Sequence, residues 1–420
     1  MTERLLQYIW QFSYFNVYDL HTEEQQPLQI IHPGSFNTNQ GPDFLNAKIK
    51  TGSTTWAGHV EIHINSSDWE LHGHGTDSNY QNVILHVVWK HDRELGLPFP
   101  TLELHNRVSS VLLQRYGEFM RSDHFIPCQQ HIHKVPEIIL QSWKERLLAE
   151  RLKDRSILIA RVLMKTNSHW EEICWWQLAR NFGIPQNADA FEAIARSLPL
   201  KIIARHKNQL QQVESLLFGQ AGLLNKSFKE AYPSMLRREY IFLTEKYGLE
   251  PIKVPIHFLR MRPANFPTVR LAQLAALLHS SHHLFSKIKE TTSIEAMQKL
   301  FNITANDYWH YHYNFEEETS YREKKLGPQM IRNILVNAIV PLLFAYGDIN
   351  SFEEMKDRSI AFTESLPPEK NKITAGFEAL GIINKNAFDS QALLQLKKEY
   401  CNNKKCLQCA IGSKIIKGLV

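Results

Sequence analysis

The sequence predicts an α/β domain over residues 1–130, with a mixed sheet flanked by helices, and an all-α domain over residues 131–420. Short apolar runs bounded by turn residues fill the first part, and such runs are typical of strands. After residue 136 the apolar side chains recur at helical spacing, and no run alternates convincingly as a strand. A chain of 420 residues can bury two or three hydrophobic cores, in agreement with this division.

The first domain is expected to contain a helix and three strands, then a short irregular segment and one or two further strands. Thr51-Gly52-Ser53 joins the two longest strands and has the length of a hairpin link. The run over residues 82–89 is apolar on both faces, as in a strand that is covered on two sides. The expected elements lie at residues 2–14, 28–32, 44–50, 55–64, 82–89 and 101–105.

The second domain is expected to be a series of helices without a repeat of fixed period. Gly183 is expected to end one helix, with Pro185 just after it. The helical pattern covers residues 137–165, 169–181, 209–218, 226–247, 268–279, 294–301, 329–346 and 387–400.

The composition is that of an ordinary globular protein, with 43% hydrophobic and 22% charged residues. No apolar run is long enough to cross a bilayer, and the N-terminus carries Glu3 without the apolar stretch of a signal peptide. We therefore expect a cytoplasmic protein with no membrane partner. The formal net charge of +5 permits contact with phosphate groups but does not demonstrate it.

The strand over residues 55–64 carries a row of polar side chains on one face. Because alternate residues of a strand share a face, His59, Glu61 and His63 point one way and apolar residues point the other. Burying such a row without a partner or a metal would be costly. Asp43 lies on the other arm of the predicted hairpin, and two carboxylates on adjacent strands can hold one Mg²⁺ or Mn²⁺. The sequence therefore predicts a metal site on this hairpin.

Pro42-Asp43 and Glu61-Ile62-His63 resemble the PD-(D/E)xK core of the restriction-endonuclease-like superfamily, and the predicted order of elements agrees. The resemblance implies a metal-dependent nuclease that hydrolyses phosphodiester bonds of nucleic acid, DNA foremost. In that superfamily the two acidic residues bind the metal and a lysine orients the attacking water, which gives the roles expected of Asp43, Glu61 and His63. His63 departs from the lysine: it is a suitable general base near pH 7 but lacks a fixed positive charge.

Two alternatives stay open because of this departure at His63. The first is a non-catalytic nucleic-acid-binding or scaffold protein that keeps the nuclease-like fold. The second is a zinc hydrolase that uses His59, Glu61 and His63, since imidazoles favour a softer ion than Mg²⁺.

Further residues near the motif are expected to support the site. Gln40 precedes Pro42 and can position the loop, although turn chemistry explains it as well. His72 and His74 can reach phosphate or assist the base, and the simpler interpretation is a polar turn whose side chains cap backbone groups. Asp68 belongs to Ser66-Ser67-Asp68-Trp69, which offers capping side chains for a short helix.

The chain also resembles, over nearly its whole length, a bacterial domain-of-unknown-function family (two-eight-five-one) of the Bacteroidetes type. This resemblance implies no established activity, so the function must be inferred from the site. The matching stretches are Asn37-Thr38-Asn39-Gln40-Gly41-Pro42-Asp43-Phe44, Gly58-His59-Val60-Glu61-Ile62-His63, Ser67-Asp68-Trp69, Arg262-Pro263-Ala264-Asn265-Phe266-Pro267 and the C-terminal cysteine cluster.

Five cysteines, an odd number, argue against a disulfide framework in a reducing compartment. Cys401-x4-Cys406-x2-Cys409 offers three thiolates, and tetrahedral Zn²⁺ or an iron–sulfur cluster needs four ligands. Cys128 is the best candidate for the fourth, whereas Cys174 stands beside two tryptophans and is expected to pack as a small apolar residue. We expect zinc or an iron–sulfur cluster that joins the C-terminus to the first domain.

Arg260, Arg262 and Arg270 surround Asn265-Phe266-Pro267 at the expected start of a helix. Arginines beside a helix N-terminus can bind phosphate, so these three residues are candidates for contact with nucleic acid.

Overall fold

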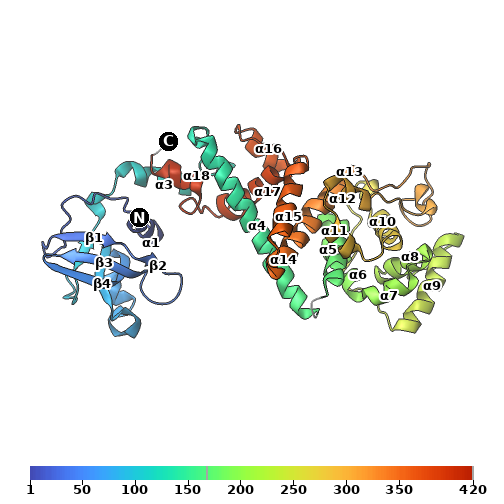
Figure 1. Ribbon diagram of the computed structural model, residues 1–420, viewed down its shortest axis with the longest axis horizontal. Coiled ribbons are helices and arrows are strands. Elements are labelled where there is room, and N and C mark those ends of the chain that lie inside the picture. The colour runs from blue at the N-terminus through green and yellow to red at the C-terminus, as the bar shows by residue number, and fades with distance from the viewer. Residues whose placement is uncertain (167–168, 419–420) are drawn as a thin grey trace. The chain divides into compact units, whose positions relative to one another are not determined.

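A computed structural model describes residues 1–166 and 169–418, which form two compact units (Figure 1). The first unit comprises Met1–Lys144, Ala379–Gly381 and Gln395–Val420, and the second comprises Glu145–Glu378 and Ile382–Leu394. An α/β region followed by helices agrees with the predicted fold class. The division differs from the predicted boundary at residue 130, because the C-terminal segment from Gln395 belongs to the first unit.

The first unit is built on one mixed sheet of six strands. Its main strands lie in the order β1 (Leu28–His32), β3 (Phe44–Thr51), β4 (Thr54–Asn65), β5 (Val83–Lys90) and β6 (Thr101–Glu103). Neighbours in the series β1, β3 and β4 are antiparallel, whereas β5 is parallel to both β4 and β6. The five predicted strands are confirmed, and the two-residue β2 (Ser35–Phe36), which pairs with β3, was not predicted.

Local sequence accounts for the β3–β4 hairpin and for the burial of β5. Gly52 has a φ of +57° in the link, a conformation that glycine adopts without a steric penalty. Thr51 pairs with Thr54 on either side of this link. Strand β5 is buried continuously from Val83 to Val88, as its run of apolar residues predicts.

Helix α1 (Glu3–Gln11) contacts β4 and buries its apolar face, including Leu5, Leu6 and Ile9. The short helix α2 (Asp68–Leu71) follows β4 and also contacts that strand. Helix α3 (Ser110–Arg121) packs against α18 (Ala410–Ile416) from the C-terminal segment. Nη1 of Arg115 donates a hydrogen bond to the carbonyl of Ile415 (3.1 Å), and the Tyr8 hydroxyl lies 2.7 Å from that of Ser413.

Helices form the second unit, and the predicted helical runs are confirmed with small shifts at their ends. Gly183 caps α5 as predicted, its N–H donating to the carbonyl of Ala179, but the next helix begins at once and holds Pro185 in its first turn. The unit boundary at Lys144 falls within α4. The helices are α4 (Glu137–Lys165), α5 (Trp170–Phe182), α6 (Ile184–Ser197), α7 (Leu200–His206), α8 (Leu210–Gln220), α9 (Ala231–Tyr247), α10 (Pro267–Ser280), α11 (Leu284–Glu290), α12 (Ile294–Leu300), α13 (Pro328–Ile334), α14 (Val340–Asn350), α15 (Glu353–Ser365), α16 (Lys372–Glu378) and α17 (Ala387–Gln395).

One helical stretch, Pro328–Asn350, is long and apolar enough to cross a membrane by length and composition. It spans α13, a π-helical turn (Leu335–Ile339) and α14, and 72% of its most apolar window is buried inside the protein. Because the core helix of a globular protein passes the same test, its composition reflects its place in the hydrophobic core.

Candidate metal centre

Asp43 and Glu61 meet where β3 begins beside β4. The backbone N–H of Asp43 donates a hydrogen bond to Oε2 of Glu61 (3.0 Å), and the N–H of Ile62 donates to Oδ2 of Asp43 (3.2 Å). Gln7 of α1 donates from Nε2 to Oδ1 of Asp43 (2.8 Å). The hairpin therefore brings together Asp43 and Glu61, the two acidic residues that the sequence predicts as metal ligands.

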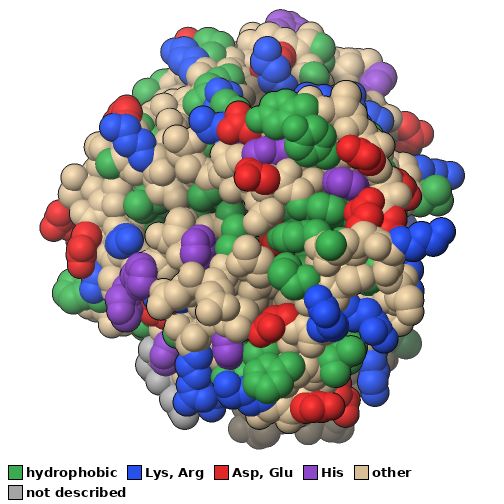
Figure 2. Space-filling model, turned by 90° about the vertical axis from the view of Figure 1, so that its right-hand side faces the viewer, with side chains coloured by type: hydrophobic (Ala, Val, Ile, Leu, Met, Phe, Trp, Pro, Cys, Tyr) green, Lys and Arg blue, Asp and Glu red, His purple; other side chains and the backbone are tan. Residues whose placement is uncertain are grey.

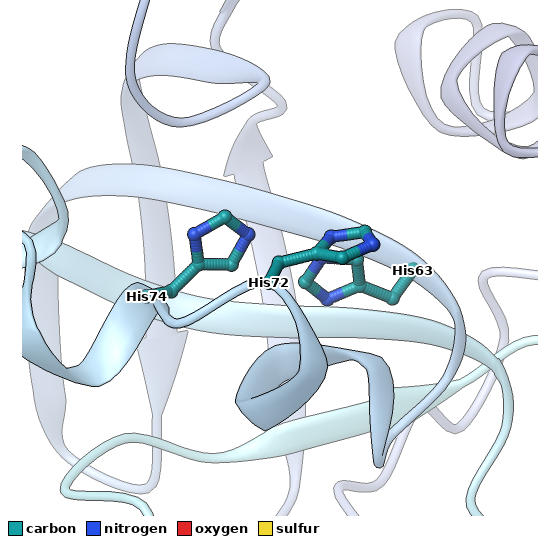
Figure 3. Close-up of side chains that lie close together, drawn as sticks. All are labelled: His63, His72 and His74. Atoms are coloured by element: carbon teal, nitrogen blue, oxygen red, sulfur yellow. The ribbon is translucent and has the colours of Figure 1, made fainter.

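Three imidazoles, those of His63, His72 and His74, lie close together (Figure 3). His63 belongs to β4, whereas His72 and His74 follow α2, and one ring nitrogen of each lies within 4.8 Å of those of the other two. Nε2 of His63 lies 3.5 Å and Nε2 of His74 lies 3.4 Å from Oε1 of Glu61. Nε2 of His63 also lies 3.1 Å from Nδ1 of His72. The Glu61 carboxylate therefore lies next to two of the three imidazoles, those of His63 and His74.

A second layer of rings holds these imidazoles in place. Nε2 of His86 on β5 lies 2.8 Å from Nδ1 of His63, and both side chains are buried. Trp69 of α2 contacts the rings of His63, His74 and His86, with ring centroids 6.3, 5.3 and 5.4 Å away. Tyr80 stacks on His74 at a centroid distance of 3.9 Å. This packing restricts the orientation of the His63 and His74 rings.

The two carboxyl groups hold their protons unusually tightly in the absence of a cation. Burial raises the pKa of Asp43 to about 6, although the hydrogen bond from Gln7 opposes the shift. Burial and then the charge of Asp43 raise the pKa of Glu61 to about 9. Taking such a pair out of water costs free energy unless a positive charge lies between them.

The pKa values of three imidazoles, those of His63, His74 and His86, are shifted in the opposite direction. Burial, with smaller contributions from the neighbouring histidines, lowers the pKa of His63 to about 2. Burial likewise lowers the pKa of His86 to about 3, and the pKa of His74 is lowered for the same reason. The rings of His63 and His86 are therefore neutral near pH 7, which is the form that binds a metal.

The donor set fits a divalent metal ion. Two buried ring nitrogens, Nε2 of His74 and Nδ1 of His86, have no hydrogen-bond partner among the residues that the structure describes, and the first of these lies 3.4 Å from Oε1 of Glu61. His72 is exposed, so the cluster has an open side through which a substrate or water can approach. Carboxylate and imidazole ligands together suit Mn²⁺, Fe²⁺ or Zn²⁺, whereas carboxylates alone suit Mg²⁺.

Three residues of the predicted supporting set have turn or capping contacts instead. Oδ2 of Asp68 accepts a hydrogen bond from the N–H of Asn65 (2.9 Å). Nδ1 of His59 accepts one from the N–H of Asn46 (3.3 Å). The Gln40 side chain is exposed, and its carbonyl accepts a hydrogen bond within its own turn. Of the polar row on β4, Glu61 and His63 face the cluster, and His59 binds the β3 backbone.

His72 and His74 were expected only to support the site, with a polar turn as the simpler interpretation. Both are members of the histidine cluster. Gly73 has a φ of +71° and lets the chain turn between them, so that both rings lie near His63. The His-Gly-His spacing was a usable signal for this arrangement. Nothing local in the sequence pointed to Gln7, because its contact with Asp43 depends on how α1 packs on the sheet.

The three predicted arginines have different environments in the second unit. Arg260 and Arg262 are exposed. Arg270 is buried in α10, where it donates hydrogen bonds to Oε1 of Gln273 (3.0 Å) and Oδ1 of Asn265 (2.5 Å). Burial lowers the pKa of Arg270 to about 10. Arg270 therefore ties the loop before α10 to that helix, which differs from the predicted contact with nucleic acid.

All four cysteines proposed as ligands, Cys128, Cys401, Cys406 and Cys409, lie in the first unit, and Cys174 lies in α5 of the second. Neither the curated proteins nor the solved structures gave a significant match to the chain. The family model described as "Protein of unknown function (DUF2851)" matches residues 3–372, a range that includes every residue of the candidate metal centre and ends before Cys401. The chain therefore belongs to the DUF2851 family.

Proposed function

We propose that the protein is a metal-dependent phosphodiesterase that hydrolyses nucleic acid, DNA foremost, at the centre formed by Asp43, Glu61 and His63. One observation carries the proposal: the Glu61 carboxylate accepts a hydrogen bond from the Asp43 backbone, next to a cluster of imidazoles in which burial keeps His63 neutral near pH 7. A divalent cation bound there would polarise a phosphodiester and lower the pKa of a water molecule.

The topology of the first unit supports a restriction-endonuclease-like fold within this proposal. The chain runs through α1, the antiparallel strands β1, β3 and β4, then α2, and then β5 parallel to β4. Asp43 directly precedes β3 and Glu61 lies on β4. These are the positions that the PD-(D/E)xK resemblance assigns to the acidic residues.

Charge balance favours a single divalent cation. With both carboxyl groups ionised and the imidazoles neutral, Asp43 and Glu61 contribute two negative charges, which one divalent cation neutralises. Without a cation, the raised pKa of Glu61 keeps a proton on the pair at neutral pH. The cation would therefore take the place of that proton, and its affinity would rise with pH.

His63 acts as a ligand rather than as the general base in this proposal. Its ring pKa of about 2 makes it too weak a base to accept a proton efficiently near pH 7. The same neutral ring offers a lone pair to a cation. His72 is exposed at the open side of the cluster, where its imidazole can hydrogen-bond to a water or a phosphate.

Contact with nucleic acid is supported by charge only in a general way. The net charge is +5, and Arg260 and Arg262 are exposed in the second unit. Figure 2 shows one face on which Lys and Arg side chains are interspersed with acidic and hydrophobic ones. Binding at such a surface would be weak and strongly dependent on salt.

The test is cleavage of single- and double-stranded DNA with Mn²⁺ or Mg²⁺, comparing the wild type with Asp43→Ala and Glu61→Ala. We expect each variant to lose activity by a factor of about a hundred or more, because each lacks a metal ligand. Glu24→Ala is the matched control, since Glu24 is an exposed carboxylate of the same unit. Equal cleavage by all four proteins would refute the proposal, and salt-sensitive binding without cleavage would favour a non-catalytic nucleic-acid-binding protein.

A second candidate, a zinc hydrolase, is favoured by the proximity of His63, His72 and His74. Three imidazoles and one carboxylate form a common ligand set of zinc enzymes. This candidate predicts one zinc per cluster that is lost in His72→Ala and in His74→Ala, together with zinc-dependent ester hydrolysis but no Mn²⁺-dependent cleavage of DNA. Retention of zinc in both variants would eliminate it.

A further inference from the structure

A second group of potential ligands lies in the first unit, apart from the acidic pair. Cys128 follows α3, whereas Cys401, Cys406 and Cys409 come from the C-terminal segment. Cys128, Cys406 and Cys409 are buried and Cys401 is partly buried. The fold thus collects four of the five cysteines of the chain into one unit.

The four thiols lie close enough to affect one another electrostatically. Besides burial, the neighbouring Cys409 and Cys406 raise the pKa of Cys128. The pKa of Cys401 is raised by burial and by all three of the other thiols. Burial and Cys409 raise the pKa of Cys406 to about 12. Every one of the four thiols takes part in this set of interactions.

Two lysine side chains of the C-terminal segment hold the two cysteine-bearing segments together. Nζ of Lys404 donates a hydrogen bond to the carbonyl of Met120 (2.6 Å), and Nζ of Lys397 donates to the carbonyl of Phe125. The Lys397 ammonium also lies 4.7 Å from the centroid of the Phe125 ring. These contacts anchor the C-terminal segment on the residues that lead to Cys128.

The turn around the clustered thiols is tightly packed. A Cβ atom at Gly412 in α18 would lie 2.6 Å from the carbonyl oxygen of Cys406, so only glycine allows this approach. Cys409 is the N-cap residue of α18, and its carbonyl accepts a hydrogen bond from the N–H of Ser413 (2.8 Å). These contacts hold the backbone of Cys406 and Cys409 against the first turn of α18.

We propose that Cys128, Cys401, Cys406 and Cys409 bind one thiolate-ligated metal centre, either Zn²⁺ or an iron–sulfur cluster, which joins the C-terminal segment to the α3 region. Both kinds of centre take four thiolates. Metal binding would displace four protons, and the positive charges of Lys397 and Lys404 beside Cys401 and Cys406 would offset part of the negative charge of the thiolates.

Cys174 provides the contrast. It is fully buried in α5 of the second unit, next to Trp175, and it behaves as a small apolar residue. The other four cysteines belong instead to two segments of the first unit that hydrogen bonds of Lys397 and Lys404 hold together.

The test is the metal and acid-labile sulfide content of the full-length protein, purified both in air and anaerobically. In Cys128→Ala and in Cys406→Ala we expect the content of one metal to be lower than in the wild type by a factor of about ten or more. Cys174→Ala and Glu61→Ala should retain it, and the second of these separates this centre from the carboxylate–histidine site. Iron with sulfide and visible absorption identifies a cluster, whereas zinc alone identifies a zinc site.

Two outcomes would overturn the proposal. One is a wild-type protein without zinc or iron under both conditions, and the other is undiminished metal in the folded Cys128→Ala and Cys406→Ala variants. If those variants are insoluble, the metal-free wild type can be titrated with Co²⁺. Thiolate-to-cobalt charge-transfer absorption at one Co²⁺ per chain supports the proposal, and its absence contradicts it.

Discussion

Nδ1 of His63 lies 2.8 Å from Nε2 of His86, and this contact joins β4 to β5 at the candidate metal centre. When His63 donates the shared proton from Nδ1, its Nε2 carries a lone pair toward Glu61 and His72. In that tautomer the contact with His86 leaves Nε2 as the nitrogen of His63 that can bind a metal. A histidine ligand oriented by a hydrogen bond to its other nitrogen is a recurrent feature of metal sites.

We expect His86→Leu to weaken metal binding by about 10- to 100-fold, because it removes the acceptor that orients His63. His86→Gln keeps an acceptor and should lose less affinity. Calorimetric titration with Mn²⁺ and Zn²⁺ measures both effects, with circular dichroism to confirm folding. An unchanged dissociation constant in folded His86→Leu would show that His63 is not oriented in this way.

The metal-free protein should lose stability as the pH rises from about 6.5 to 9. The folded-state pKa of Glu61, about 9, lies above its ordinary value of 4.5, so over this range the folded state keeps a proton that the unfolded state has released. Stability therefore falls with increasing pH, by an amount on the order of 1–3 kcal/mol. Urea denaturation at several pH values in the presence of a chelator measures it.

Glu61→Gln removes the titrating carboxyl group and should flatten this decline. At acid pH the dependence reverses, because the pKa values of His63 and His86 lie far below the ordinary value of 6.5. Below that value the unfolded state binds protons that the folded state does not, which lowers stability as the pH falls. A wild-type profile that is level from pH 6.5 to 9 would contradict the burial of Glu61.

Gly58→Ala should destabilise the first unit by about 1–3 kcal/mol. A Cβ at Gly58 would lie 2.5 Å from the carbonyl oxygen of Asn82 and 2.5 Å from Cγ2 of Ile84, where β4 meets the start of β5. Gly75→Ala is the control, since a Cβ there meets only Nε1 of Trp69, at 4.0 Å. Thermal denaturation measures the stability of both variants. Equal melting temperatures for Gly58→Ala and Gly75→Ala would show that β5 shifts to make room for the methyl group without loss of stability.

Substitution of the three arginines near α10 should affect DNA binding and stability differently. Arg260→Ala and Arg262→Ala should weaken DNA binding without loss of stability. Each lost phosphate contact should reduce the slope of the logarithm of the binding constant against the logarithm of salt concentration by about one. Arg270→Ala should instead destabilise the second unit by about 1–3 kcal/mol, because Asn265 and Gln273 lose a charged partner. Fluorescence anisotropy at several salt concentrations, beside thermal denaturation, distinguishes the two effects.

Short-range patterns were sufficient to predict five of the six strands and the proximity of Asp43 and Glu61. The alternation of β4 places Glu61 and His63 on one face, and the Gly52 link sets the hairpin that brings Asp43 beside them. Such features depend on neighbouring residues and on a period of two, so the sequence alone reveals them.

Features that depend on packing between distant segments were harder to predict. His72 and His74 lie in a segment without a period, and their place in the cluster depends on how α2 and Trp69 pack on β4. Arg270 is buried because α10 is covered on every side from Pro267 to Leu278, which its charged residue does not suggest.

The division of the first unit between both ends of the chain also affects the order in which the protein forms during translation. Residues 145–394 leave the ribosome before Gln395, and at roughly 5–20 residues per second their synthesis takes tens of seconds. During that interval the hairpin with Asp43 and Glu61 exists without α18. The acidic pair can therefore meet a cation well before the C-terminal thiols have been synthesised, so the nascent chain would acquire its two proposed metals in sequence.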